Sequence, residues 1–314
     1  MKLATFEIAS RQSFGVVRED RVVDIPTLWP DGPATLLAAF EAGPQALATI
    51  AALASAAHRS PLATHDLKSV RLLAPLPAPP KLLGLAVNYL EHHREFDRGH
   101  DMPDDPSRTT TPRPFLMPTT AVAGPGDEIP WPAFSRQIDY EVELAVVIGR
   151  TARRVSAKDA MDFVAGYTIA NDISARSCTH AQGRGKRPKD DFFDWLHGKW
   201  ADAFCPMGPW MVTADEVGDP QKLAIGLSVN GETRQQSSTE LMIHSVAEIV
   251  SFCSHLMTLA PGDVIATGTP SGVGMASGRF LAAGDRITCT IEKIGDLTNT
   301  LGSAPAEFYE PCNR

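Results

Sequence analysis

Residues 139–150 read DYEVELAVVIGR, and this stretch decides the fold class. Successive side chains of a β-strand point to opposite faces, so Asp139, Glu141 and Glu143 are expected to project from one face of a strand. The run then becomes apolar, and LAVVIG at residues 144–149 is typical of a buried strand. The pattern therefore predicts a core strand that carries acidic groups at the edge of the core.

Similar short runs continue along the chain and are separated by turn residues. Further β-like runs lie at residues 165–173, 210–214, 224–231, 263–268 and 285–295. Two helices are expected between them, each introduced by a capping box, formed by Ser156 with Asp159 and by Ser245 with Glu248. We therefore predict a mixed α/β fold in which strands dominate.

The N-terminal part of the chain is expected to form a small module of its own. Residues 1–75 contain hairpin-like runs and an Ala/Leu-rich stretch near residues 34–57 that is typical of a helix. The segment LPAPP at residues 76–80 is stiff, because each proline fixes its own φ and restricts the preceding residue. We predict a small N-terminal α+β domain over residues 1–75 and a larger domain over residues 76–314.

One long polar segment interrupts the larger domain. Residues 97–113 are rich in Asp, Pro, Thr and Arg and show almost no apolar periodicity. Loops of this length without structure of their own are often functional. We therefore predict a mobile surface loop that acts as a lid.

Composition and charge exclude several classes of function. The chain has 314 residues with 37 acidic and 29 basic side chains, a net charge of −8 and no long basic stripe, so nucleic acid is not an expected partner. The most apolar stretch, residues 46–57, is shorter than the roughly 20 residues that span a bilayer, so no membrane association is expected. The cysteines are odd in number, widely spread and free of a CxxC pair, which fits neither a disulfide framework nor a zinc ribbon. We expect a soluble, cytoplasmic protein.

The acidic end of the core strand indicates a cation site. Buried carboxylates either become neutral or meet a cation, and a hard divalent ion such as Mg²⁺ prefers oxygen ligands of this kind. Asp172 is the natural third ligand beside Glu141 and Glu143, because it ends the next apolar run and the spacing leaves room for one helical crossover. The alternative is that the two glutamates line a solvated strand face and that Asp172 caps a turn.

Five sequence blocks, in order, closely resemble the fumarylacetoacetate hydrolase family. They read PRPFLMPTTAVAGPGDEIPWP, DYEVELAVVIGR, GYTIANDISAR, GKWADAFCPMGPW and ATGTPSGVG. The resemblance covers about residues 76–295. It implies a β-sandwich roll that assembles as a homodimer, with Mg²⁺ or Mn²⁺ held by Glu141, Glu143 and Asp172.

The same resemblance implies a catalytic pair on a short helix. The segment GLAVNYLEHHREF matches the family's NYxxHxxE element, which assigns His92 and Glu95 as the pair and Tyr89 as a substrate-binding residue. Residues three apart share a helix face, so the carboxylate can orient an imidazole that takes a proton from water. His93 falls one place off the motif and is the reserve candidate.

Three more residues are assigned to the site through the resemblance. Arg176 resembles the family's contact to the substrate carboxylate, and a guanidinium fork suits a 2-oxo acid. Lys199 resembles a lysine that faces the reacting carbonyl, where a cation stabilises developing oxyanion charge. Thr269 is expected to contact the substrate through its hydroxyl or backbone, while neighbouring glycines permit tight turns. The alternative for Arg176 and Lys199 is ordinary surface charge.

Three positions depart from the family pattern. Met117 stands where many relatives have lysine, which removes a positive charge near the site. Thr179 stands where relatives often have an amide, and Trp200 adds bulk beside Lys199. These departures concern the identity of the substrate rather than the metal chemistry.

The resemblance implies metal-dependent hydrolysis of a carbon–carbon bond in a 2,4-dioxo acid of the acylpyruvate or fumarylpyruvate type, in the breakdown of aromatic compounds or sugar acids. The same enolate chemistry serves isomerisation of 2-hydroxydienoates and decarboxylation of 2-oxo acids, which are the closest alternatives. A non-catalytic, metal-dependent binding protein is the alternative from another class. The intact set of His92, Glu95 and Lys199 argues against it, because binding alone does not require a base.

Overall fold

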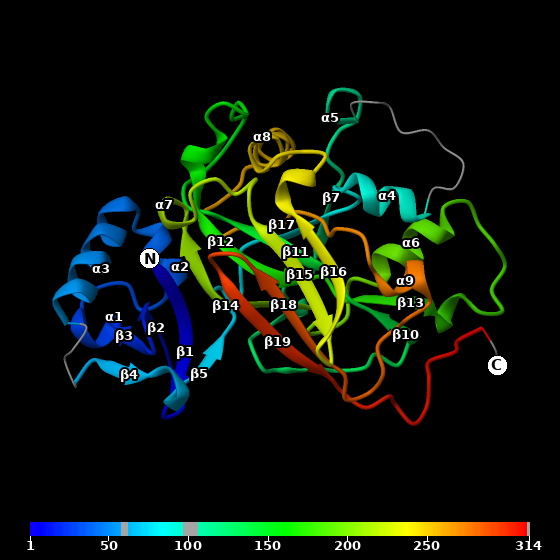
Figure 1. The fold of residues 1–314 in the computed structure, drawn as a ribbon, viewed down its shortest axis with the longest axis horizontal. Coiled ribbons are helices and arrows are strands. Elements are labelled where there is room, and N and C mark those ends of the chain that lie inside the picture. The colour runs from blue at the N-terminus through cyan, green and yellow to red at the C-terminus, as the bar shows by residue number, and fades with distance from the viewer. Residues whose placement is uncertain (58–61, 97–105, 313–314) are drawn as a thin grey trace.

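The computed structural model describes residues 1–57, 62–96 and 106–312. Two packed β-sheets form most of it, and the N-terminal helices lie at one end (Figure 1). This arrangement confirms the predicted mixed α/β fold in which strands dominate. Within these ranges, no helix combines the length and the apolar character needed to cross a membrane. Residues 97–105 of the predicted lid fall outside the described residues, so the lid stays a prediction.

The larger sheet combines strands of the N-terminal module with strands from the rest of the chain up to residue 266. In hydrogen-bonding order they are β4 (Thr64–Asp66), β3 (Arg21–Asp24), β2 (Arg11–Arg18), β1 (Lys2–Ile8), β14 (Cys205–Thr213), β12 (Val164–Asn171), β11 (Val142–Ile148), β17 (Val264–Ala266), β6 (Leu82–Leu85) and β7 (Pro114–Met117), with β5 (Arg71–Leu73) beside β1 and β8 (Val122–Ala123) beside β14. Strand β11 lies between β12 and β17 and is buried along its whole length. The predicted core strand is therefore confirmed.

The connection between β11 and β12 differs from the prediction. The two strands are antiparallel neighbours, with Glu143 opposite Ala170, so the expected helical crossover is wrong. The predicted helix after Ser156 is only a 3₁₀ turn, η3 (Ala160–Phe163), and β12 begins directly after it. Ser156 donates its hydroxyl to the Asp159 carboxylate at 2.7 Å instead of capping a longer helix. The β-branched and aromatic residues that follow favour a strand, which overrides the local helix signal.

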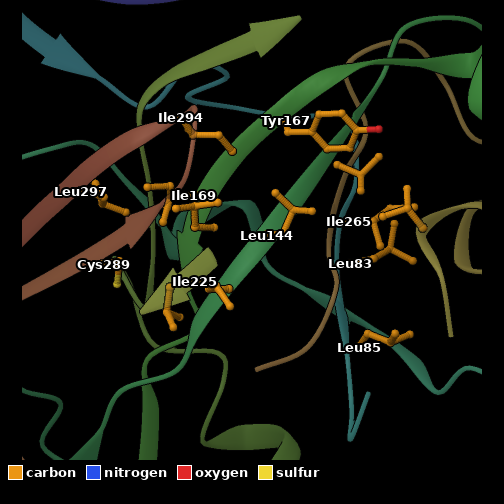
Figure 2. Packing of buried hydrophobic residues seen from close by; sticks show 14 of the residues in the cluster. Leu83, Leu85, Leu144, Tyr167, Ile169, Ile225, Ile265, Cys289, Ile294 and Leu297 are labelled. Atoms are coloured by element: carbon orange, nitrogen blue, oxygen red, sulfur yellow. The ribbon is translucent and has the colours of Figure 1, made fainter. Parts of the chain in front are cut away.

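A smaller sheet packs against the larger one. Its strands, in order, are β16 (Glu232–Ser238), β15 (Ala224–Val229), β18 (Arg286–Ile291), β19 (Gly295–Leu301) and β9 (Glu128–Ile129), and a separate pair is formed by β10 (Ser135–Asp139) and β13 (Ser174–Cys178). Figure 2 shows Leu144 and Ile169 of the larger sheet packed with Ile225, Cys289 and Leu297 of the smaller sheet. This sheet-on-sheet contact forms the main hydrophobic core.

The helices have 4 to 14 residues. They are α1 (Ile25–Leu28), α2 (Leu36–Glu41), α3 (Pro44–Ala57), α4 (Leu90–Phe96), α5 (Pro106–Thr109), α6 (Asp190–His197), α7 (Ala214–Val217), α8 (Val246–Leu256) and α9 (Gly274–Ser277), and the remaining 3₁₀ turns are η1 (Leu67–Ser69), η2 (Thr119–Ala121), η4 (Thr179–Ala181) and η5 (Thr239–Leu241). Helices α2, α3 and α8 contribute buried side chains to the hydrophobic cores. Helix α8 begins with the predicted capping box, because Ser245 and Glu248 each accept a hydrogen bond from the other's backbone N–H. The second predicted helix is therefore confirmed.

The N-terminal module, residues 1–75, shares its sheet with the rest of the chain. Strands β1, β2 and β3 form the predicted hairpin pattern, and α2 and α3 occupy the predicted helical stretch. Strand β1 also pairs with β14, with Leu3 opposite Met211, and one core cluster contains both Phe14 and Ala145. The boundary at residue 75 stays a prediction, but the two parts are continuous through one sheet and one core.

Candidate metal centre and active site

Three predicted acidic residues meet where β11 begins and β12 ends. Glu143 lies on β11, Glu141 directly precedes this strand, and Asp172 directly follows β12. Antiparallel pairing brings the two ends together, and the Asp172 N–H donates to the Glu141 carbonyl at 2.9 Å. One carboxylate oxygen from each residue lies within 4.8 Å of the other two, and all three side chains are buried. We call this group the acidic cluster.

Asp139 does not join the acidic cluster, although the alternation predicts it on the same face. Strand β10 ends at Asp139 and β11 begins at Val142, so the two-residue repeat is broken between them. The Asp139 carboxylate instead accepts hydrogen bonds from the backbone N–H groups of Gly274 at 2.6 Å and Met275 at 3.0 Å. Asp139 therefore anchors the first turn of α9.

Two cations face the acidic cluster, the fully buried Lys199 and the largely buried Arg176. The Lys199 ammonium donates to Glu141 Oε2 at 2.8 Å and to Asp172 Oδ2 at 2.7 Å. The Arg176 guanidinium donates to Glu141 Oε1 at 2.5 Å and to Asp139 Oδ2 at 3.2 Å. Both predicted cations therefore lie inside the site, and the alternative that they are surface charges is excluded by their burial.

The cations neutralise the acidic cluster only in part. Burial raises the pKa of Glu141, but Lys199 and Arg176 outweigh this effect and lower that pKa to about 2. Burial and the neighbouring Asp172 raise the pKa of Glu143 well above its ordinary value. Burial also raises the pKa of Asp172 to about 6, even though Lys199 opposes the shift. The cluster therefore lacks positive charge on its Glu143 side.

A divalent cation fits this donor set. Among the described residues, the buried Asp172 Oδ1 has no hydrogen-bond partner, which is costly unless another group uses its lone pairs. Carboxylate oxygens are the ligands that Mg²⁺ and Mn²⁺ prefer, and a bound ion favours the ionised form of each acid. Glu141, Glu143 and Asp172 are the residues that would hold the ion. Their burial and convergence argue against the alternative of a solvated strand face.

A second group of metal-ligating side chains provides a contrast. His180, Asp194 and His197 also bring one ligand atom each within 4.8 Å of one another. Arg184, however, donates to both Asp194 oxygens, at 2.8 and 2.6 Å. That carboxylate already has a bidentate cationic partner, so this group does not show the charge deficit of the acidic cluster.

Helix α4 brings the predicted catalytic pair to the site. His92 Nδ1 lies 3.1 Å from Glu95 Oε2, as the i, i+3 spacing predicts. Glu95 Oε1 also accepts a hydrogen bond from the Gly272 N–H at 2.7 Å, so its carboxylate is held from both sides. His92 lines the same cavity as the acidic cluster, whereas His93 lines a small neighbouring recess. The structure therefore places His92, not the reserve candidate His93, next to the predicted metal ligands.

The glycine-rich segment after β17 positions two of these carboxylates. Gly268 has a φ of +93° and donates its N–H to Glu143 Oε2 at 2.7 Å, while Gly272 has a φ of +103° and donates to Glu95. A Cβ at Gly268 would lie 2.7 Å from the Cβ of Asn88, so the close approach requires glycine. The sequence predicted tight turns at these positions, but not their role as hydrogen-bond donors to the site.

A cavity of about 540 Å³ connects these groups. Its walls include six of the predicted site residues, namely His92, Glu141, Asp172, Arg176, Lys199 and Thr269. Thr269 follows β17 and its hydroxyl accepts a hydrogen bond from Gln235 Nε2 at 2.9 Å, which fixes the side chain. The cavity is therefore large enough for a small organic acid beside the acidic cluster.

Tyr89 and the three family departures lie away from the cavity walls. Tyr89 packs in the main core, and burial together with the charge of Glu143 raises its pKa. Met117 packs in the core shared with the N-terminal module, so its missing charge does not face the cavity. Thr179 donates its hydroxyl to the Tyr309 carbonyl at 2.5 Å, and Trp200 Nε1 lies 3.3 Å from the Leu116 carbonyl. None of the four supports a direct contact with substrate.

Sequence reasoning missed the apolar wall of the cavity. Its large members are Phe115, Phe192, Trp195 and Met275. The ring centroid of Trp195 lies 4.9 Å from that of Phe115 and 6.0 Å from that of Phe192. The i, i+3 spacing of Phe192 and Trp195 in DDFFDWLH is a signal for one helix face, but nothing in that spacing connects it with the acidic cluster.

The chain is similar to known proteins over almost its whole length. The family described as "Fumarylacetoacetate (FAA) hydrolase C-terminal" matches residues 81–302. The sequence is 38% identical over 280 residues to oxaloacetate tautomerase Fahd2a, mitochondrial, of Rattus norvegicus, covering 88% of this chain and 83% of that protein.

Two solved structures resemble the fold closely. Fumarylacetoacetate hydrolase from the psychrophilic Exiguobacterium antarcticum matches with a TM-score of 0.76 and 34% identity, covering 96% of this chain and 99% of that one. Maleylpyruvate hydrolase from Sphingobium sp. SYK-6, in complex with manganese(II) ion and pyruvate, matches with a TM-score of 0.74 and 32% identity, covering 97% of this chain and 100% of that one. These matches confirm the predicted fold type and support a divalent metal at the acidic cluster. The chain belongs to the fumarylacetoacetate hydrolase family.

Proposed function

We propose that the chain is a divalent-metal-dependent hydrolase that cleaves a carbon–carbon bond in a 2,4-dioxo acid of the acylpyruvate or fumarylpyruvate type. One observation carries the proposal: His92, which is paired with Glu95, lines the same cavity as Glu141 and Asp172 of the acidic cluster. The cluster suits binding of a metal-chelating 2-oxo acid. Hydrolysis also requires activation of water, and His92 is the base that would supply it.

The ligand set defines how the substrate would be oriented. Bound Mg²⁺ or Mn²⁺ would supply Lewis acidity that stabilises negative charge on the departing enolate. Arg176 uses its Nε and Nη2 for carboxylates of the protein, and its guanidinium has further N–H donors for the substrate carboxylate. Lys199 places a permanent positive charge at the cavity wall, where it stabilises charge on the attacked carbonyl oxygen.

The hydrolytic step follows from the position of His92. Because Nδ1 faces Glu95, the ring would take the proton of water at Nε2, while the water oxygen attacks the carbonyl carbon at position 4. The bond between carbons 3 and 4 then breaks and its electron pair leaves as the enolate of pyruvate. The other product is the carboxylic acid of the acyl group. Glu95 stabilises the imidazolium that forms, since it is itself held by the Gly272 N–H.

The second candidate is tautomerisation of an oxaloacetate-type 2-oxo acid. The 38% identity to the rat oxaloacetate tautomerase over 88% of this chain favours it. In that reaction His92 would move a proton between carbon 3 and the enol oxygen, and no bond between carbons would break. Decarboxylation of a 2-oxo acid is a variant that depends less on the base.

Product analysis by NMR separates these reactions. The full chain is incubated with Mg²⁺ or Mn²⁺ and a panel that contains acylpyruvates, fumarylpyruvate, 2-hydroxydienoates and oxaloacetate. The proposal expects pyruvate and a carboxylic acid in equal amounts from a 2,4-dioxo acid. Rapid enol–keto exchange without cleavage would instead support the tautomerase. Binding without any turnover would indicate a non-catalytic binding protein.

Replacement of the base tests the mechanism itself. His92→Ala should lower kcat for cleavage by on the order of 10² to 10⁴-fold, which is the usual contribution of a general base. Glu95→Gln should give an intermediate loss because the imidazole remains but loses its charged partner. His93→Ala is the matched control and should retain cleavage. Full activity of His92→Ala would contradict the proposed role.

A further inference from the structure

The walls of the cavity differ in chemistry. Glu141, Asp172, Arg176 and Lys199 contribute charged groups, and the large apolar groups come from Phe115, Phe192, Trp195 and Met275. The Lys199 ammonium lies 5.9 Å from the ring centre of Trp195, so the aromatic wall lies directly beside the charged groups. A substrate whose carboxylate binds the charged groups would therefore place the rest of the molecule next to aromatic side chains.

The aromatic wall offers little to a second carboxylate. The proposed function assigns Arg176 and Lys199 to the 2-oxo acid part of the substrate, and both also pair with carboxylates of the protein. Arg113 is the other guanidinium on the described walls, and its side chain is exposed. Water screens an exposed ion pair strongly, so Arg113 alone gives weak selection for a charged group.

Part of the apolar wall of the cavity is exposed to solvent in the described part of the chain. Phe192 is 53% exposed and Met275 is 50% exposed, although both line the cavity. Large apolar side chains that remain exposed in this way mark a binding surface when they gather around a cavity. A second cavity of about 540 Å³ shares Arg176, Trp195 and Met275 with the first, so there is space for a bulky group beyond Trp195.

We propose that the substrate is a 2-oxo or 2,4-dioxo acid whose far end is an uncharged aryl or bulky apolar group, as in an aroylpyruvate. Trp195 and Phe192 are the residues that determine this specificity, through contact with the far group rather than with the reacting atoms. The inference deepens the proposed function and rests on it for the placement of the 2-oxo acid end. It differs from a preference for dicarboxylic substrates, which would need a buried cation among the aromatic side chains.

Calorimetric binding tests the specificity without relying on turnover. The full chain with Mg²⁺ is titrated with phenylpyruvate and with 2-oxoglutarate, which share the 2-oxo acid end and differ in the far group. Phenylpyruvate should bind at least about tenfold more tightly. Phe192→Ala should remove most of this preference and leave oxalate binding unchanged, since oxalate has no far group.

Phe193→Ala is the matched control for this variant. Phe193 is the next residue on α6 and is 48% exposed, but it does not line either cavity. It should therefore retain the preference for phenylpyruvate. Trp195→Ala should act in the same direction as Phe192→Ala, and Trp195→Phe should recover part of the preference because it restores an aromatic ring.

The turnover comparison distinguishes failure of this inference from failure of the proposed function. The ratio of kcat/KM for benzoylpyruvate to that for fumarylpyruvate should exceed about ten in the unmodified chain and fall in Phe192→Ala. If 2-oxoglutarate bound more tightly than phenylpyruvate and Arg113→Gln abolished that difference, the apolar specificity would be wrong. The proposed hydrolase activity would not be affected by that result. Preferential binding of phenylpyruvate without cleavage of any 2,4-dioxo acid would overturn the hydrolase and leave the specificity in place.

Discussion

Asp24 in the N-terminal module and Asp172 in the acidic cluster are both buried, with 0% and 1% of their surface exposed, but their surroundings are opposite. Asp24 accepts hydrogen bonds from Arg11 at 2.5 Å, from the Ser13 hydroxyl at 2.7 Å and from the Thr27 hydroxyl at 3.0 Å. Asp172 is bound by Lys199 through one oxygen, and the other oxygen has no partner among the described residues.

The pKa values reflect this difference. Burial raises the pKa of Asp24, but the hydrogen bonds from Ser13, Arg11 and Thr27 outweigh burial and bring it below its ordinary value of 3.8. Burial dominates at Asp172 and raises its pKa to about 6. A carboxylate that stabilises the fold has hydrogen-bond partners within the chain for both oxygens. A carboxylate that binds a ligand leaves an oxygen without a partner in the chain, which lowers the stability of the fold. The comparison therefore predicts that substitution of Asp24 lowers the stability of the fold, whereas substitution of an acidic-cluster residue does not lower it when metal is absent.

The largest expected effect is on metal binding. Glu143→Gln should weaken Mg²⁺ affinity by more than about a hundredfold, because loss of an outer partner of a metal ligand alone costs up to that much. Without metal the variant should unfold at the same or a higher temperature, since glutamine removes a buried acid that lacks positive charge beside it. Calorimetry and thermal unfolding measure the two quantities. Unchanged Mg²⁺ binding would show that Glu143 is not a ligand, and Glu95→Gln serves as the control that keeps the acidic cluster.

The position of the acidic cluster was predictable from sequence because it depends on local patterns. Glu143 precedes an apolar run in β11, and Asp172 ends the next apolar run, so both strand ends were expected to carry acids. The crossover was wrong since antiparallel pairing depends on hydrogen bonds between segments, which residue patterns within one segment do not reveal. The prediction for Asp139 was wrong for a similar reason, because its carboxylate accepts a hydrogen bond from Gly274, which is far away in the sequence.

The aromatic wall of the cavity was not predictable in the same way. Phe115 comes from β7, Trp195 from α6 and Met275 from α9, and only the folded chain brings these segments together. Short helices such as α6 carry too few residues for a clear apolar repeat. The resemblance to the family assigned the charged residues, because they lie in the family's sequence motifs. It did not assign the aromatic wall, which we propose determines the choice of substrate.

The second prediction concerns the response of stability to metal. Mg²⁺ at a hundred times its dissociation constant should raise the free energy of unfolding of the unmodified chain by about 2.7 kcal/mol, because the ion binds only the folded state. Asp24→Asn should show the same increment, since Asp24 lies outside the acidic cluster. Glu143→Gln should show almost none. Urea denaturation with and without Mg²⁺ gives these differences, and an equal increment in all three proteins would place the ion elsewhere.

The third prediction concerns the stability that Asp24 supplies. Asp24→Asn should lower the free energy of unfolding by about 1 to 3 kcal/mol, because the buried hydroxyl of Ser13 and the guanidinium of Arg11 lose their charged acceptor. Arg11→Gln should cost less, at about 0 to 1 kcal/mol, since the arginine side chain is half exposed and water screens its charge. Urea denaturation without metal measures both values. A loss in Arg11→Gln as large as that in Asp24→Asn would mean that the ion pair, not the buried network, carries the stability.

The smallest expected effect is the pH dependence of that stability difference. Because the pKa of Asp24 is lower in the folded chain than its ordinary value of 3.8, the folded state binds this proton less readily than the unfolded state. The charge-dependent part of its contribution is therefore complete above pH 3.8 and is lost as the pH falls through the folded value. The difference in unfolding free energy between the unmodified chain and Asp24→Asn should shrink in this acid range. Comparing the two proteins cancels the titration of the carboxylates that both contain. A difference that stayed constant into strong acid would show that Asp24 stabilises the fold through the shape of its side chain and not through its charge.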